Sequence, residues 1–163
     1  MPDKTDFLKN AEGIIKRNSN MVYKLAFSQM KNKDDADDVY QDVFCRYIKK
    51  KQIFESAEHE KAWFIRVTLN CCKTAMKSFW KTKTSELDEN IEVSYVDKKD
   101  LSEALMKLPK RYNAVLHLFY YEDLSVDEIA RTLEISNSNV RMLLTRARRA
   151  LKEILERSSD DEK

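Results

Sequence analysis

The 163-residue sequence predicts an all-α protein of two small helical domains joined by a flexible acidic linker, with a helix-turn-helix in the C-terminal domain. One glycine, two prolines and 36% charged residues are typical of helices and not of folds rich in tight turns. Apolar residues also recur at three-and-four spacing along most of the chain. This spacing is lost between residues 82 and 100, which separates domains expected at residues 6–81 and 101–157.

The first helical region is expected from Asp6 to Phe54, with a break near Asn32. We expect Asn32 to lie in the turn and Asp34 to be the N-cap of the following helix. The apolar stripe of that helix consists of Ala36, Val39, Tyr40, Val43, Phe44, Tyr47 and Ile48. Its other face is acidic, because residues 34–44 contain five aspartates and no base. Either an ordinary solvated face or a contact surface for a cationic partner explains this pattern.

The next helix is expected to follow Ser56, its N-cap, and to continue to Trp80. Its apolar side consists of Phe64, Val67, Cys71, Ala75 and Phe79. The opposite side carries cations and one amide, namely Arg66, Asn70, Lys73, Lys77 and Lys81. Residues 61–85 contain no acid, so this polar face is purely cationic. We expect Trp63 to pack in the core rather than to serve as a stacking platform.

The segment expected to be a linker, residues 82–100, is rich in acidic residues and has no sustained period. One face of the helix after it carries Leu101, Leu105 and Leu108. Pro109 then fits the first turn of another helix, where a missing N–H does no harm. Ser125 and Glu128 have the spacing of a capping box and predict the start of the next helix.

The segment from Val126 to Lys152 predicts a helix-turn-helix, with the small Ala130 where two helices approach closely. The apolar residues that fit two short crossing helices are Ile129, Leu133, Ile135, Val140 and Leu143. The ionisable residues of the second helix, residues 137–152, are Arg141, Arg146, Arg148, Arg149 and Lys152. An acid-free helix with a polar beginning suits a DNA groove, because polar tips reach base edges and cations reach phosphates.

The remaining residues indicate no catalytic, metal or cofactor site. No glycine loop for phosphate, no paired carboxylates beside a nucleophile and no metal-ligand spacing is present, so we expect no enzyme and no small-molecule substrate. Adjacent Cys71 and Cys72 lack the spacer of metal and redox motifs, and we interpret the three cysteines as reduced small hydrophobes. Without a signal peptide or a bilayer-length apolar run, the expected compartment is the cytoplasm.

Residues 10–80 and 101–157 together resemble the bacterial RNA polymerase sigma factors, in particular the extracytoplasmic-function (ECF) group of the sigma-70 family. The N-terminal motifs that carry the resemblance are Asp35–Phe44, which is similar to the core-binding helix, and Ala62–Asn70, which is similar to the start of the promoter-melting helix. The motifs similar to the reader of the minus-thirty-five element are Leu108–Tyr112, Leu124–Ala130, Val140–Arg141 and Arg146–Leu151. A lone helix-turn-helix is common to many regulators, whereas both modules in this order are specific.

The resemblance implies a promoter-specificity subunit whose partners are core RNA polymerase, through its clamp helices and flap, promoter DNA, and an anti-sigma factor. The residues that it assigns to core polymerase are Asp38, Gln41 and Asp42. Those assigned to the single-stranded minus-ten element are Arg66, Asn70, Lys73 and Lys77, with Asn70 lining a pocket for a flipped base. Those assigned to the minus-thirty-five element are Ser136, Asn139, Arg141, Met142, Thr145 and Arg146.

Two residues of the helix-turn-helix depart from the family pattern. Glu134 stands in the turn where glycine is usual, and a left-handed conformation there costs a residue with a side chain about 1–2 kcal/mol. Met142 replaces a small polar residue, so it can contact a thymine methyl group but cannot hydrogen-bond to a base.

Other interpretations of the same residues remain open at this stage. A conventional helix-turn-helix regulator would bind its operator without polymerase, and a thiol enzyme would depend on Cys71 or Cys72. The acidic linker is either a solvated tether or a nucleic-acid mimic in the polymerase cleft. The acids of this second hypothesis are Glu86, Asp88, Glu89, Glu92 and Asp97.

Overall fold

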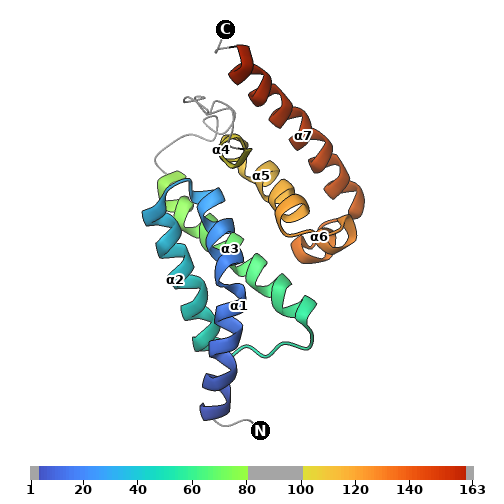
Figure 1. Ribbon diagram of the computed structural model, residues 1–163. Coiled ribbons are helices and arrows are strands. Elements are labelled where there is room, and N and C mark those ends of the chain that lie inside the picture. The colour runs from blue at the N-terminus through green and yellow to red at the C-terminus, as the bar shows by residue number, and fades with distance from the viewer. Residues whose placement is uncertain (1–3, 81–100, 161–163) are drawn as a thin grey trace. The chain divides into compact units, whose positions relative to one another are not determined.

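The computed structural model describes residues 4–80 and 101–160, with side chains at 7–74, 101 and 103–157. The chain divides into two compact units, Met1–Met76 and Lys77–Lys163, and each is considered by itself. Every element in the described ranges is a helix, which confirms the predicted all-α class (Figure 1). The linker predicted at residues 82–100 and its five acids lie outside the described residues.

The first two helices, α1 (Lys4–Met30) and α2 (Lys33–Lys50), form a tight antiparallel pair. Lys31 ends α1 with a left-handed φ of 69°. Asn32 is extended and its side-chain oxygen accepts a hydrogen bond from the Asp35 N–H at 2.8 Å. The expected N-cap, Asp34, was therefore wrong. The helix starts earlier because Asn32 already satisfies a free N–H, and Asp34 lies in the first turn, where its charge favours the helix dipole.

The core of the N-terminal unit is an aromatic cluster between α2 and α3 (Ala57–Trp80). Phe64 is fully buried, and its ring centroid lies 5.5 Å from Phe44, 5.5 Å from Tyr47 and 5.0 Å from Trp63. Trp63 is only 8% exposed, so its predicted place in the core is confirmed. The helix begins as predicted, because the Ser56 hydroxyl accepts a hydrogen bond from the His59 N–H at 3.0 Å.

Three apolar positions in this unit are more exposed than their pattern indicated. Tyr40 is half-buried, and its hydroxyl donates to Ser19 at 3.0 Å. Ile48 is 43% exposed because it lies about 100° around α2 from the buried Tyr47. Val67 is half-buried, whereas its neighbour Thr68 is fully buried. A threonine can replace an apolar residue there because its hydroxyl donates to the Phe64 carbonyl at 2.6 Å. The predicted apolar positions Ala75 and Phe79 lie outside the described side chains.

A buried carboxylate connects α1 to the first turn of α3. The Glu60 residue is 7% exposed, and its oxygens accept hydrogen bonds from Arg17 at 2.7 and 2.9 Å and from the Asn18 amide at 3.0 Å. The hydrogen bonds from Arg17 are the main reason that the pKa of Glu60 is lowered, against the opposing effect of burial. This network sets how the beginning of α3 lies on α1.

The Glu60 network should make the stability of this unit depend on pH. Since the folded pKa lies below the ordinary value of 4.5, the stabilisation is present above that value and is lost as the pH falls through the folded pKa. We expect Glu60→Gln to cost about 1–2 kcal/mol at neutral pH. In urea titrations the difference in unfolding free energy between wild type and variant should shrink as the pH falls below 4.5 and through the folded pKa. An unchanged gap would contradict this role of Glu60.

The C-terminal unit contains α4 (Leu101–Met106), α5 (Lys110–Leu116), the π-helical turn η2 (His117–Tyr121), α6 (Val126–Leu133) and α7 (Asn137–Asp160). Its core is built around α7, which packs against α4, α5 and α6. Leu105 and Leu108 are buried as expected, but Leu101 is 47% exposed and the buried position one turn later is Ala104. Pro109 is the N-cap of α5 and precedes the predicted first turn by one position.

Candidate polymerase and nucleic-acid interfaces

The acidic face of α2 lies opposite the residues that α2 buries. Asp38, Gln41 and Asp42 are exposed, whereas Val39 and Val43 are buried. In the described part of the chain, Asp38 and Gln41 have no recorded side-chain hydrogen bond or ion pair. A carboxylate and an amide are thus available to an external partner on one helix face.

Asp42 differs from its two neighbours on this face because it has partners inside the protein. One carboxylate oxygen lies 3.3 Å from Arg46 Nε one turn later. Burial, with a smaller contribution from the Asp42 carboxylate, raises the pKa of the Cys71 thiol to about 12. Cys71 therefore stays a neutral thiol at physiological pH. The Asp42 side chain thus has an ion-pair partner within the protein, whereas the Asp38 side chain has none among the described residues.

The cationic row of α3 follows one stripe of the helix. Positions 66, 70, 73 and 77 lie within about 60° of one another at 100° per residue. Asn70 and Lys73 are exposed. Arg66 is half-buried and already interacts within the protein. The Lys77 side chain and Lys81 lie outside the described residues.

The helix-turn-helix has the local features that the sequence predicts. The Ser125 hydroxyl accepts from the Glu128 N–H and the Glu128 carboxylate accepts from the Ser125 N–H, both at 3.1 Å, which confirms the capping box. Glu134 has the left-handed φ of 59° expected of the turn, and its N–H donates to the Ala130 carbonyl. The Asn137 amide also donates to the Asp127 carboxylate, which joins the start of α7 to α6.

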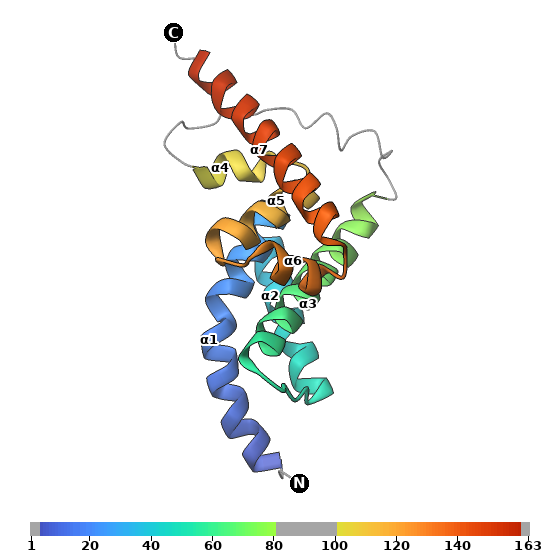
Figure 2. The same cartoon turned by 90° about the vertical axis from the view of Figure 1, so that its right-hand side faces the viewer.

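Figures 1 and 2 both show α6 beside the N-terminal end of α7, the arrangement that presents α7 as a recognition helix. The buried side of α7 contains Val140, Leu144 and Ala147. Leu144 was missed by the sequence pattern, which favoured the half-buried Leu143. A one-position error of this kind arises because both leucines fit the apolar period.

The opposite side of α7 carries the residues assigned to DNA. Arg141, Thr145 and Arg146 are exposed, and Met142 is 41% exposed. Asn139 is half-buried, and its N–H donates at 3.1 Å to the exposed Ser136, which caps the helix. The Ser136 hydroxyl is thus already used by the protein as an acceptor, and the Thr145 hydroxyl donates to the Arg141 carbonyl at 2.9 Å.

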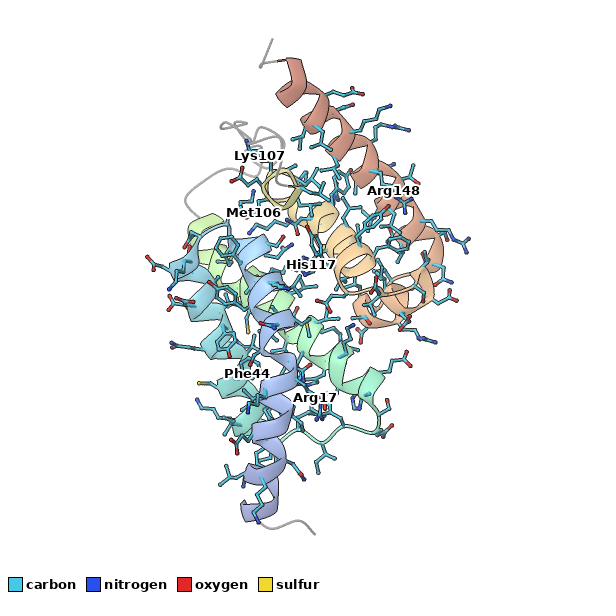
Figure 3. All side chains as sticks on the ribbon, viewed as in Figure 1. Arg17, Phe44, Met106, Lys107, His117 and Arg148 are labelled. Atoms are coloured by element: carbon cyan, nitrogen blue, oxygen red, sulfur yellow. The ribbon has the colours of Figure 1, made fainter. Side chains whose placement is uncertain are left out.

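Arg148 has a role that no local pattern revealed. Its Nε donates to the Tyr120 hydroxyl at 2.9 Å, and its guanidinium carbon lies 5.3 Å from the Phe119 ring centroid (Figure 3). A hydrogen bond together with a cation–π contact connects α7 to η2. Arg148 therefore contributes to the packing of the C-terminal unit and is not one of its free surface cations.

Both units match known protein families. Residues 14–82 match Sigma-70 region 2, and residues 98–151 match Sigma-70, region 4. The chain is 35% identical over 136 residues to the RNA polymerase sigma factor SigV of Bacillus subtilis, covering 80% of each chain. It is 30% identical over 156 residues to the ECF RNA polymerase sigma factor SigM of the same organism, covering 88% of this chain and 93% of SigM. The chain belongs to the ECF group of the sigma-70 family.

The fold is also similar to that of a solved sigma factor. The structure of RpoE in complex with the anti-sigma factor NepR, from Bartonella quintana, matches with a TM-score of 0.71 at 19% identity, over 91% of this chain and 98% of that one. The matched segments lie close to the domains predicted at residues 6–81 and 101–157, whose limits remain predictions. None of the described helices is long and apolar enough to cross a membrane.

As a sigma factor, this protein binds core RNA polymerase, recognises the minus-ten and minus-thirty-five promoter elements and promotes the initiation of transcription. Region 2 and region 4 occur together in the predicted order, which disfavours the alternative of a conventional regulator that acts without polymerase.

The described residues contain no cluster of three or more histidine, cysteine, aspartate or glutamate side chains that could hold a metal ion.

Proposed function

We propose that this sigma factor divides its work among three surfaces: the acidic face of α2, the cationic row of α3, and the exposed side of α7. The observation that carries the proposal is the separation of charge in the N-terminal unit. The exposed residues of one α2 face are acidic or amide, whereas the polar row of α3 is cationic. One unit can therefore bind a cationic protein surface and an anionic nucleic acid with different helices.

The α2 face is proposed to bind the arginine-rich clamp helices of the largest polymerase subunit. Guanidinium groups pair well with carboxylates because they form charge-assisted and often bidentate hydrogen bonds. Asp38 and Gln41 are exposed and available for such contacts. Asp42 would contribute with its second oxygen, since the first lies near Arg46. The C-terminal unit is proposed to contact the flap.

The α3 row is proposed to hold the single-stranded minus-ten element. The exposed Lys73 suits a phosphate, and the exposed Asn70 amide can donate to and accept from a flipped base. Arg66 is a weaker candidate for contact with the DNA backbone than its position in the row indicates, because its side chain is half-buried. Lys77 is also proposed to contact the DNA backbone, and this assignment depends on its position in the sequence alone.

The exposed side of α7 is proposed to read the minus-thirty-five element in the major groove. Arg141 suits bidentate recognition of a guanine, and Met142 suits a thymine methyl group. Thr145 and Arg146 follow on the same side of the helix, and both are exposed. Ser136 and Asn139 lie at the start of the helix, where the helix dipole favours a phosphate of the DNA backbone.

Three further parts of the proposal concern partners and chemistry. The protein performs no covalent reaction and takes no small-molecule substrate, since it is a specificity subunit of an enzyme. We propose the cytoplasm as its compartment because polymerase and chromosomal DNA are there. We also propose an anti-sigma factor as a partner, supported by the complex in which the similar RpoE was solved.

A gel-shift experiment with and without core polymerase tests the function. We expect weak binding of the free protein to its promoter and strong, specific binding of the complex with core. The promoter is first obtained by mapping transcription starts after overexpression. Strong operator-like binding without core would favour the conventional regulator instead.

In the same assay, Arg141→Ala should weaken recognition of the cognate promoter by about 1–3 kcal/mol, because it removes a base contact. A duplex with a scrambled minus-thirty-five element should be bound almost as well by the variant as by wild type. Equal loss on both duplexes would show that Arg141 contacts only the backbone.

A further inference from the structure

Arg148 and Arg149 are adjacent cations on α7 with different surroundings. Both are exposed. The guanidinium of Arg148 is occupied by Tyr120 and Phe119 of η2. For Arg149, no hydrogen bond, ion pair or ring contact is recorded with the residues that the structure describes. The local sequence makes the two arginines look equivalent, but only Arg149 is available to an external anion.

Arg149 also lies on the side of α7 proposed to face DNA. It follows Met142 by seven residues, so the two side chains leave the helix within about 20° of each other. Arg148 follows Arg141 by the same seven residues, so direction alone does not exclude it from DNA, but its guanidinium is held by Tyr120 and Phe119 of η2. The buried Val140 and Ala147 occupy the opposite side.

The spacing along α7 places Arg149 at the edge of the groove rather than over its floor. Eight residues separate it from Arg141, which corresponds to about 12 Å of helix. The major groove is also about 12 Å wide, so a helix whose N-terminal part reaches bases has the sugar–phosphate backbone near its later turns. A guanidinium matches a phosphate with two parallel hydrogen bonds.

We infer that Arg149 is a further DNA contact, which binds a backbone phosphate beside the minus-thirty-five element, and that Arg148 makes no DNA contact and instead holds α7 on η2. The inference rests on the proposed function of the α7 face and extends it by one residue that the resemblance does not assign. It predicts different effects for two substitutions that change net charge equally.

The test uses complexes of the full chain with core polymerase, bound in the cold before strand opening. Affinity is measured across a range of salt concentrations for the cognate duplex and for one with a scrambled minus-thirty-five element. We expect Arg149→Gln to weaken both by a similar factor, roughly threefold to tenfold, and to make the slope of log affinity against log salt shallower by about 0.9. Arg149→Lys should retain the slope, because it keeps the charge.

Arg148→Gln is the matched control, since it also removes one positive charge. We expect it to leave the salt slope unchanged and to lower the thermal midpoint of the C-terminal unit, which Arg149→Gln should not lower. Wild-type affinity and slope in Arg149→Gln, or an equal loss of slope in Arg148→Gln, would overturn the inference. Arg141→Ala distinguishes the two proposals: if this variant loses promoter preference while Arg149→Gln keeps wild-type affinity and salt slope, the α7 proposal stands and the Arg149 inference fails.

Discussion

Asp38→Arg should weaken binding of this sigma factor to core polymerase by about 2–5 kcal/mol, because it replaces a proposed partner of a guanidinium with a like charge. Asp38 is exposed in the middle of α2, without a recorded partner among the described residues. The substitution should not damage the helix itself. The new arginine would have Asp34 and Asp42 one turn away on either side, an arrangement that is favourable in helices.

Direct titration of labelled protein with core polymerase measures this effect, and run-off transcription measures its consequence. Glu12→Arg is a suitable control, since Glu12 is also exposed, on α1, and changes the net charge by the same amount. A similar loss in both variants would indicate a general electrostatic effect. Normal core binding by Asp38→Arg would show that the polymerase surface is elsewhere.

Phe64→Ala should destabilise the N-terminal unit by about 3–5 kcal/mol, because it leaves a cavity in a close-packed aromatic cluster. The side chain is fully buried and contacts rings from two helices and the connection between them. Besides Phe44 and Trp63, this cluster includes Phe54, whose ring centroid lies 5.7 Å from Phe64. The loss of one ring therefore removes several contacts at once.

Urea unfolding followed by tryptophan fluorescence measures this loss when all variants also carry Trp80→Phe, since Trp63, which lies in the cluster, is then the sole tryptophan of the chain. The transition of the C-terminal unit, followed by circular dichroism, should stay where it is in wild type. Phe64→Leu should cost much less than Phe64→Ala, because it keeps most of the volume. Equal costs for both variants would mean that ring packing contributes little.

Local signals in the sequence were sufficient for most helix boundaries. Ser125 with Glu128 predicted the start of α6. The left-handed turn at Glu134 was expected from the family resemblance rather than from a local signal. The N-cap of α2 was misassigned because Asn32 and Asp34 are both good caps at neighbouring positions, and only the backbone conformation distinguishes them. The predicted end at Phe54 was also too late, because α2 ends at Lys50 and Lys51 adopts a left-handed φ of 50°.

Contacts between distant residues could not be predicted in the same way. Glu60 and Arg17 are 43 residues apart, and nothing near either residue indicates the other. Arg148 and Tyr120 are 28 residues apart, and the local pattern of α7 offers Arg148 to DNA. In each case a long-range bond decides which charged side chains remain available for a partner, so exposure and pairing refine what periodicity alone indicates.

For the candidate surfaces, periodicity predicted which side of each helix is polar, but not how free each side chain is. Asp38, Lys73 and Arg146 are exposed. Arg66 lies in the same row as Lys73 and is half-buried. A row of cations on a helical wheel has equal members only in projection, because residues at different heights along the helix have different neighbours, and Arg66 already interacts within the protein.

The two hydrophobic cores also have a consequence for how this regulator can change over time. The aromatic cluster of the first unit and the leucine-rich packing around α7 share no described core residue, so we expect a harmful change in one core to leave the other folded. The preference for a minus-thirty-five sequence can consequently change one residue at a time without destabilising the N-terminal unit that binds core polymerase. Substitutions in α7 alone can therefore give paralogues with new target genes, while the surface that binds core polymerase is kept.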